Sequence, residues 1–273
     1  MTGRRGRSIP AIAGLLATAA ILILTPEPAR ADGNSLIGYP QSNIMGKNAF
    51  HVDWDTVGTK ANTNVFSAIG ITYGLGTGLR GRRGGDGSDQ DGFLGRAEVG
   101  IDYLLTAGPN VPTFVPTNER FYLNFKMQLY NDVATKTRVV TGMYNLGSNS
   151  LQTARELYIL ASEDRPWGKI QVGLTHAFGK EEGLMTPAGH ADRTYAQLSY
   201  NRHLWQRLFG AYAGYTGQST QSRQSVAIAY YLDNTYKGSF ALGYLLYNDK
   251  SMQPSRNQIY FGFDYDWGGR QKP

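Results

Sequence analysis

Large apolar or aromatic residues alternate with small or polar residues along most of this chain, whereas the spacing of an amphipathic helix almost never occurs. The clearest example is the segment QIYFGFDYDW at residues 258–267. Every second residue, from Ile259 to Trp267, is large and apolar or aromatic, and the residues between them are mostly small or acidic. Because successive side chains of a β-strand point to opposite faces, this segment is predicted to be a strand with one apolar and one polar face.

The same alternation predicts about twelve strands, each near the length that crosses a bilayer at a tilt. The clearest are residues 49–56, 65–79, 93–105, 121–130, 169–178 and 258–267. Further strands are predicted at residues 137–146, 154–162, 194–200, 208–216, 225–232 and 239–247. The faces of residues 137–146 and 154–162 cannot be assigned from the pattern. The predicted fold class is all-β, a closed antiparallel transmembrane barrel of about 12 strands within a range of about 10–14.

The connections between these segments are rich in Gly, Asn, Asp, Ser and Pro, as turns require. Those after odd-numbered strands include the long ones, residues 107–119, 179–193 and 248–257, and those after even-numbered strands are mostly short, such as residues 233–237. Outer-membrane barrels show this asymmetry between extracellular loops and periplasmic turns. Residues 80–92 form a long connection after an even-numbered strand. This exception weakens either the predicted number of strands or the assignment of extracellular and periplasmic sides at that point.

Alternation alone does not distinguish a soluble sandwich or lipocalin-like barrel from an outer-membrane barrel, because the two differ only in which face meets water. The polar face favours the membrane, since it mixes Gly, Ala and Thr with scattered charges of both signs. Aromatic residues near strand ends, typical of interfacial girdles, favour it as well. They are Phe121, Tyr215, Phe240, Tyr265 and Trp267.

The N-terminus also favours export. Residues 1–31 combine a basic start, an apolar run at residues 9–24 and the small-x-small pattern Ala29-Arg30-Ala31, and they are predicted to be a cleaved Sec-type signal peptide. Residues 32–273 would then form a single barrel domain. Cleavage would remove four arginines and one glutamate, which lowers the net charge from +6 to +3.

The composition excludes several classes of site and partner. The chain has no cysteine, which rules out a disulfide framework, a thiolate metal site and a catalytic thiol. No basic stripe or recognition-helix pattern is present, so no nucleic-acid partner is expected. No cofactor is expected either.

The segment QIYFGFDYDW resembles the C-terminal strand of Gram-negative bacterial outer-membrane β-barrel proteins, porin-like and at the level of the superfamily only. In that superfamily, alternating aromatics at the end of the last strand are the signal that the barrel-assembly machinery reads. The resemblance implies this role for Phe263, Tyr265 and Trp267.

In a closed barrel the last strand pairs with the first, so Asp264 and Asp266 are expected beside the strand that carries His51, Asp53 and Asp55. Nearby strands are expected to add Arg96, Glu98, Asp102 and Lys126 to the lumen. The opposite wall is predicted to be small and weakly polar, with Gly210, Gly214, Ala227, Ala229, Ala241 and Gly243. This charged wall is either a selectivity filter or a network of ion pairs that braces a closed barrel.

Motifs with other chemistry are weak. Residues 84–89 match one copy of a calcium-binding glycine-rich repeat, and residues 87–98 resemble an EF-hand loop, but a single repeat and a following strand favour a solvated loop without metal. His176 falls on the apolar face near the predicted extracellular rim, where a lipid-modifying enzyme would need it, yet its own strand supplies no serine nucleophile.

The sequence therefore predicts a porin-like passive channel for small hydrophilic solutes in the bacterial outer membrane, with no enzymatic activity. The expected partners are outer-membrane lipid, the barrel-assembly machinery and the transported solutes. The alternative is a non-conducting barrel that acts as an envelope scaffold or binds a partner through residues 179–193. A third hypothesis is a lipid-modifying enzyme that depends on His176.

Overall fold

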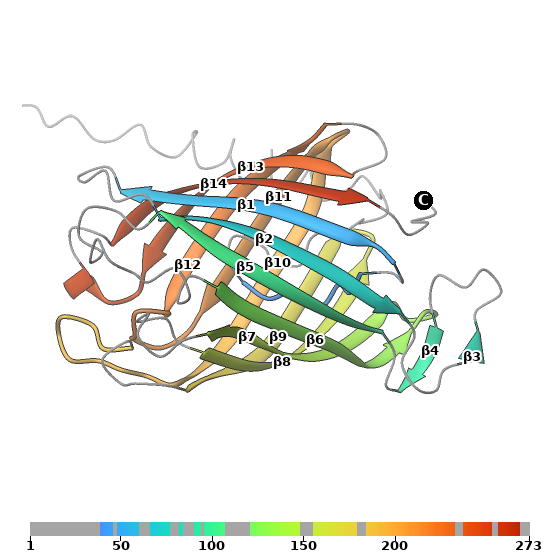
Figure 1. The fold of residues 1–273 in the computed structure, drawn as a ribbon, viewed down its shortest axis with the longest axis horizontal. Helices are drawn as coiled ribbons and strands as arrows, with labels where there is room; N and C mark the ends of the chain where they lie inside the picture. Colours follow the sequence, from blue (N-terminus) through green and yellow to red (C-terminus); the bar gives the residue numbers. More distant parts are fainter. Residues whose placement is uncertain are drawn as a thin grey trace, which may run out of the picture.

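The computed structural model describes residues 39–45, 48–59, 66–76, 82–83, 90–93, 96–106, 121–147, 155–178, 184–232, 237–252 and 256–267. Twelve strands form a closed antiparallel β-barrel, shown in Figure 1. They are β1 (Phe50–Thr59), β2 (Phe66–Gly76), β5 (Ala97–Thr106), β6 (Phe121–Asp132), β7 (Thr137–Gly147), β8 (Arg155–Arg165), β9 (Gly168–Phe178), β10 (Thr194–Trp205), β11 (Leu208–Tyr215), β12 (Arg223–Tyr231), β13 (Gly238–Tyr247) and β14 (Asn257–Trp267). The described residues include no helix with the length and apolar character needed to cross a membrane.

The barrel closes because the first and last strands pair with each other. The β1–β14 ladder runs without a register shift from Phe50 opposite Trp267 to Thr59 opposite Gln258. β6 and β7 also pair, so each of the twelve strands has a neighbour on both sides. The backbone groups of each strand can therefore be satisfied within the sheet, as a bilayer requires.

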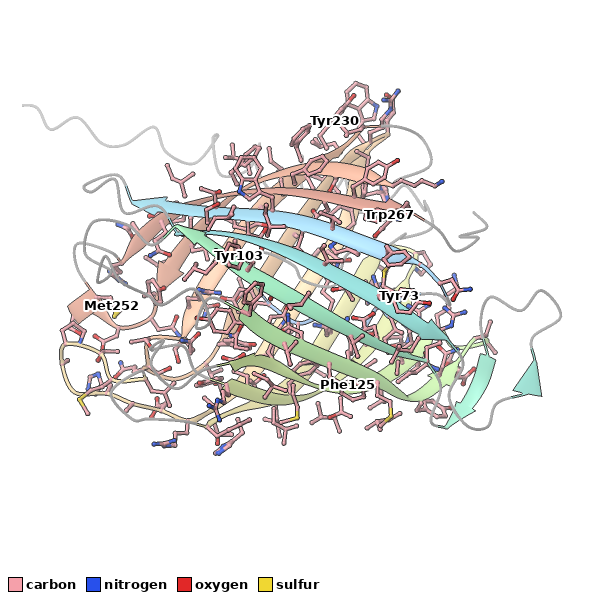
Figure 2. The ribbon with its side chains drawn as sticks, in the orientation of Figure 1. Tyr73, Tyr103, Phe125, Tyr230, Met252 and Trp267 are labelled. Carbon is pink, nitrogen blue, oxygen red and sulfur yellow. The ribbon has the colours of Figure 1, made fainter. Side chains whose placement is uncertain are left out.

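The apolar face of each strand points outward. On β9, Leu174 is 56 % exposed and the adjacent Thr175 is 0 % exposed, and the same alternation continues around the barrel. Aromatic side chains project from the outer surface near strand ends, as Tyr230 does in Figure 2. The apolar rows thus lie on the outer surface and the polar rows enclose the interior, which is the arrangement predicted for a membrane barrel.

The two ends of the barrel differ in their connections. At one end, here called the short-turn end, the chain reverses through residues 133–136, 166–167 and 206–207. β1 begins and β14 ends at this same end (Figure 1). The opposite end, here called the long-loop end, includes residues 184–193 and the 3₁₀ helix η3 (Lys250–Met252). In outer-membrane barrels these ends face the periplasm and the exterior, respectively.

The long connection at residues 80–92 does not change the number of barrel strands. Its described residues form two short strands, β3 (Arg82–Arg83) and β4 (Gln90–Phe93). β4 pairs with the end of β6, where Phe93 lies opposite Tyr130, so these strands are an appendage at the short-turn end. The prediction that Phe93 begins the next barrel strand was therefore wrong, because that strand begins at Ala97.

Two predictions about faces were also wrong. Tyr215 is only 2 % exposed and points into the lumen, so it is not part of the aromatic girdle. Gly210 and Gly214 point outward, because they lie opposite the outward-facing Ile228 and Leu198 in the neighbouring strands. Gly and Ala residues indicate no preference for either face, which is why β11 could not be read correctly from its sequence.

The outward orientation of β9 predicts the effect of a charge on its outer face. Val172→Arg places a guanidinium on a face that meets hydrocarbon, and we expect the free energy of unfolding to fall by about 2–4 kcal/mol. Denaturant titration in lipid vesicles measures this loss. Ala188→Arg, at an exposed position beyond the strands, is the control and is expected to change stability by less than about 0.5 kcal/mol. Equal effects of the two variants would contradict the assignment of faces.

Candidate functional site in the barrel lumen

One side of the lumen carries a row of carboxylates, here called the acidic wall, which comprises Asp53, Asp55, Asp102, Asp264 and Asp266. The β1–β14 register places His51 opposite Asp266 and Asp53 opposite Asp264. The Nδ1 atom of His51 lies 2.8 Å from Asp266 Oδ1, and its Nε2 atom lies 3.6 Å from a carboxylate oxygen of both Asp53 and Asp264. The imidazole therefore sits at the centre of three carboxylates.

Asp102 joins this wall from β5 across a glycine. Gly70 of β2 lies between Asp53 and Asp102 in the ladder. A Cβ atom at position 70 would approach Asp53 Oδ2 to 2.5 Å and Asp102 Oδ1 to 2.6 Å. Only glycine leaves room for both carboxylates, and the amide of Asn124 donates a hydrogen bond to Asp102 Oδ2 at 2.6 Å. The absence of a Cβ atom at Gly70 therefore allows the carboxylates of Asp53 and Asp102 to lie on either side of it.

Part of the acidic wall is exposed to solvent. The side chains of Asp53 and Asp264 are 17 % and 26 % exposed, whereas that of His51 is 2 % exposed. Polar neighbours hold two further oxygens, because Tyr260 donates to Asp55 Oδ1 at 2.6 Å and Ser239 donates to Asp264 Oδ2 at 3.1 Å. These bonds orient the carboxylates while leaving part of the wall open to solvent.

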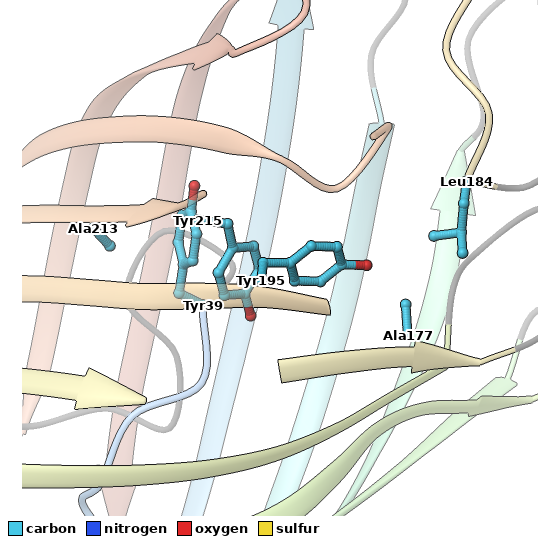
Figure 3. Packing of buried hydrophobic residues seen from close by; sticks show 6 residues of the cluster. All are labelled: Tyr39, Ala177, Leu184, Tyr195, Ala213 and Tyr215. Atoms are coloured by element: carbon cyan, nitrogen blue, oxygen red, sulfur yellow. The ribbon is translucent and has the colours of Figure 1, made fainter. Parts of the chain in front are cut away.

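The other side of the lumen is occupied by residues 39–45, here called the internal segment. It precedes β1 in the chain and is not one of the paired strands of the sheet. Tyr39 is fully buried, its hydroxyl donates to the carbonyl of Arg223 at 2.7 Å, and its ring lies 4.7 Å from that of Tyr215. Figure 3 shows Tyr215 between Tyr39 and Tyr195, whose ring lies 5.2 Å from that of Tyr215, in a buried cluster that also includes Leu184.

Glutamine and serine side chains hold the middle of the internal segment. Gln171 and Gln197 each donate from Nε2 to the carbonyl oxygen of Pro40 at 3.0 Å. The backbone N–H of Ser42 donates to Gln171 Oε1 at 2.7 Å, and its hydroxyl lies 2.6 Å from that of Ser162. Each of these contacts joins the internal segment to a distant barrel strand.

Charged side chains hold the end of the internal segment nearer to β1. Lys126 Nζ donates to the carbonyl of Asn43 at 2.6 Å, and Lys169 Nζ donates to Asn43 Oδ1 at 2.5 Å. Lys126 also forms a 2.7 Å ion pair with Glu98, in which the two side chains are 3 % and 4 % exposed. Glu98 in turn accepts a hydrogen bond from the backbone N–H of Met45 at 2.7 Å.

The predicted lumen residues therefore fall into two groups. His51, Asp53, Asp55, Asp102, Asp264 and Asp266 share the acidic wall, and Glu98 and Lys126 form a buried pair beneath the internal segment. Arg96 precedes β5, and its carbonyl accepts a hydrogen bond from the backbone of Gln128 at 2.8 Å. Sequence reasoning missed the internal segment and the residues that hold it, namely Lys169, Gln171 and Gln197.

The remaining candidates lie outside the lumen. Phe263, Tyr265 and Trp267 belong to β14, where Trp267 stacks on Phe50 at 5.4 Å, and their role as an assembly signal stays a prediction. His176 is on the outer face, and its Nδ1 atom lies 2.8 Å from the hydroxyl of Thr194. Across the described residues, no group of three or more acidic, His or Cys side chains is suited to a metal ion. Of the two calcium-like windows, residues 84–89 lie outside the described residues, as do residues 87–89 and 94–95 of the window 87–98.

The Glu98–Lys126 pair gives a prediction about stability. Lys126→Met leaves the buried Glu98 carboxylate without this cation, so we expect the free energy of unfolding to fall by about 3–5 kcal/mol. The double variant Glu98→Gln/Lys126→Met removes both charges and is expected to lose less. Urea titration in vesicles compares the two. A single variant as stable as the double variant would contradict a buried, mutually compensating pair.

No protein-family model and no curated protein sequence matches the chain. Among solved structures it is similar to a KdgM porin, at 8 % identity and a TM-score of 0.47, over 80 % of this chain and 99 % of that one. It is also similar to an outer-membrane phospholipase A from Escherichia coli, at 10 % identity and a TM-score of 0.45, over 83 % of this chain and 95 % of that one. A third similar structure is Salmonella typhi OmpF in complex with daunomycin, at 10 % identity and a TM-score of 0.37, over 80 % and 96 % of the two chains. All three are outer-membrane β-barrels, and at these scores they carry no argument about the activity of this chain.

Proposed function

We propose that this protein is a narrow, passive outer-membrane channel for small hydrophilic solutes, with a preference for cations. The observation that supports it is the division of the lumen. Asp53 and Asp264 reach water, whereas Lys126 is buried beneath the internal segment and paired with Glu98. We propose in addition that residues 1–31 direct export and are removed, and that the barrel-assembly machinery inserts the mature chain through Phe263, Tyr265 and Trp267.

The physical basis of the cation preference is the field of the acidic wall. Carboxylates lining a passage with low-dielectric walls raise the local concentration of cations and lower that of anions. Asp53, Asp55, Asp264 and Asp266 all lie in the β1–β14 ladder. His51 is the one basic residue among the paired positions of this ladder. The internal segment narrows the passage, so the proposed solutes are small.

Single-channel recording in planar bilayers under a salt gradient tests both the conductance and the preference. The wild-type protein is expected to give discrete steps and a reversal potential on the cation-selective side. Asp53→Asn/Asp264→Asn is expected to lower the cation-to-anion permeability ratio by about two- to fivefold, because it removes two negative charges from the wetted wall.

Glu163→Gln is the matched control, since Glu163 lies on the alternate face of β8 from Ser162 and pairs with Arg165 at the short-turn end. We expect it to keep the wild-type ratio. An unchanged ratio in the Asp53/Asp264 variant would refute the role of the acidic wall. Silent membranes with folded wild-type protein would refute the channel.

Binding of a partner at the long-loop end is the second candidate function. Residues 184–193 are tied to the neighbouring loops, because Asp249 accepts hydrogen bonds from Thr186 at 2.5 Å and contacts His190 at 2.8 Å. The Thr186 hydroxyl, with the Ser251 backbone N–H and His190, holds the pKa of Asp249 well below its usual range. A loop fixed in this way presents one defined surface, which suits recognition of a partner.

We propose no bond chemistry at His176. Its ladder neighbours are Leu157 and Thr194. Within the described residues no ion pair joins this ring to a carboxylate, so the His176–Thr194 contact lacks the third group that orients a catalytic base.

A further inference from the structure

The internal segment covers a cluster of three basic side chains. Lys126, Lys169 and Arg138 converge on Asn43, with Nζ or Nη1 atoms 2.6, 2.5 and 3.5 Å from its carbonyl or side-chain oxygens. Lys126 and Lys169 are nearly fully buried. Glu98 pairs with Lys126 in this cluster, and Asp164 lies 3.3 Å from Arg138.

We propose that this cluster is a latent binding site for a small anion, and that the internal segment is a displaceable plug whose Asn43 oxygens occupy the site. This inference rests on the proposed channel function. When the segment leaves, the passage widens and the exposed lysines weaken its cation preference. A phosphate or carboxylate group promotes this change by replacing the oxygens of Asn43.

The charges in the cluster favour an anionic occupant. Lys126 and Lys169 both donate to Asn43, and Asn43 is neutral. Hydrogen bonds from ammonium or guanidinium groups to an ionised oxygen are roughly twice as strong as those between neutral groups. A small anion therefore gains more from these donors than the neutral Asn43 does.

The way the segment is attached allows it to move as a unit. The contacts that hold it at Pro40, Ser42 and Asn43 come from side chains of the barrel wall. At the short-turn end the chain turns at Asn48, which has a φ of 59°, and Asn48 and Ala49 bond to Gly74 through their backbones. This turn fixes the start of β1, so release of the segment upstream of it leaves the barrel ladder intact.

A disulfide lock tests the proposal, because the natural chain has no cysteine. The hydroxyl oxygens of Ser42 and Ser162 are 2.6 Å apart, so Ser42→Cys/Ser162→Cys brings two thiols within reach of each other. Oxidation removes one hydrogen from each thiol and transfers two electrons to an added oxidant such as copper–phenanthroline. Dithiothreitol reverses the reaction in the same sample.

The oxidised double variant is expected to show a single small, cation-preferring conductance. After reduction, a second level should appear that is at least about twofold larger and less cation-selective, and inorganic phosphate should make it more frequent. Deletion of residues 39–45 should give the larger level permanently. The single variants Ser42→Cys and Ser162→Cys control for effects of the oxidant and are expected to resemble wild type.

Identical conductance and selectivity in the locked, reduced and deleted forms would overturn the plug, and would leave the channel proposal standing. A second readout does not depend on conductance. Labelling of Ser162→Cys by a membrane-impermeant thiol reagent should be slow in the full chain and become faster with phosphate or after the deletion. Silent membranes with this acceleration would refute the channel and support displacement of the segment. Labelling that stays slow in all cases would overturn the displacement.

Discussion

Closure of the sheet through the β1–β14 ladder is the constraint on which the rest of the structure depends. A strand edge in hydrocarbon leaves backbone N–H and C=O groups unpaired, at a cost of several kcal/mol for each group. The same register that removes this edge decides which side chains meet in the lumen. His51 must lie beside Asp266, and Asp53 beside Asp264, because directly opposed residues share a face. The acidic wall is therefore a consequence of how the barrel closes.

Opposed carboxylates repel each other, so this wall requires compensation. His51 contacts three of them, Tyr260 donates to Asp55, and Asn124 donates to Asp102. Water supplies the rest where Asp53 and Asp264 are exposed. On the opposite side of the lumen the groups that need compensation are cations, because Lys126 and Lys169 are buried and require hydrogen-bond acceptors. Glu98 of the barrel wall is one acceptor for Lys126, and the internal segment brings further acceptors for both lysines through Asn43.

Alternation was enough to predict about twelve barrel strands. The outward orientation of their apolar rows was predicted from the composition of the polar face, the aromatic residues near strand ends and the N-terminal segment. Alternation failed where both faces carry apolar residues or neither does. On β8, Tyr158 and Leu160 face the lumen while Leu157 and Ile159 face outward, so the middle of the strand has no polar row. The aromatic Tyr215 lies near a strand end and suggested a girdle, yet its hydroxyl and ring belong to the buried cluster around Tyr39.

The internal segment could not be predicted from local pattern, because its contacts are made with residues far away in the sequence. Met45 meets Glu98 across 53 positions, and Tyr39 meets Arg223 across 184. Its residues Pro-Gln-Ser-Asn show no period of two or of 3.6. The signal for it lies elsewhere, in inward-facing Lys169, Gln171 and Gln197, whose polar groups need partners when buried.

The sequence allowed two roles for the charged lumen residues, a selectivity filter or a brace of internal ion pairs. The two roles are compatible, because they fall on different sides of the lumen. A buried ion pair such as Glu98–Lys126 is too poorly hydrated to act on a passing ion, and it serves to hold the internal segment. In the proposed channel, a partly exposed carboxylate such as Asp264 contributes little to packing but sets the field in the passage. One chain therefore uses the same residue types for both purposes, and their degree of burial decides which purpose each serves.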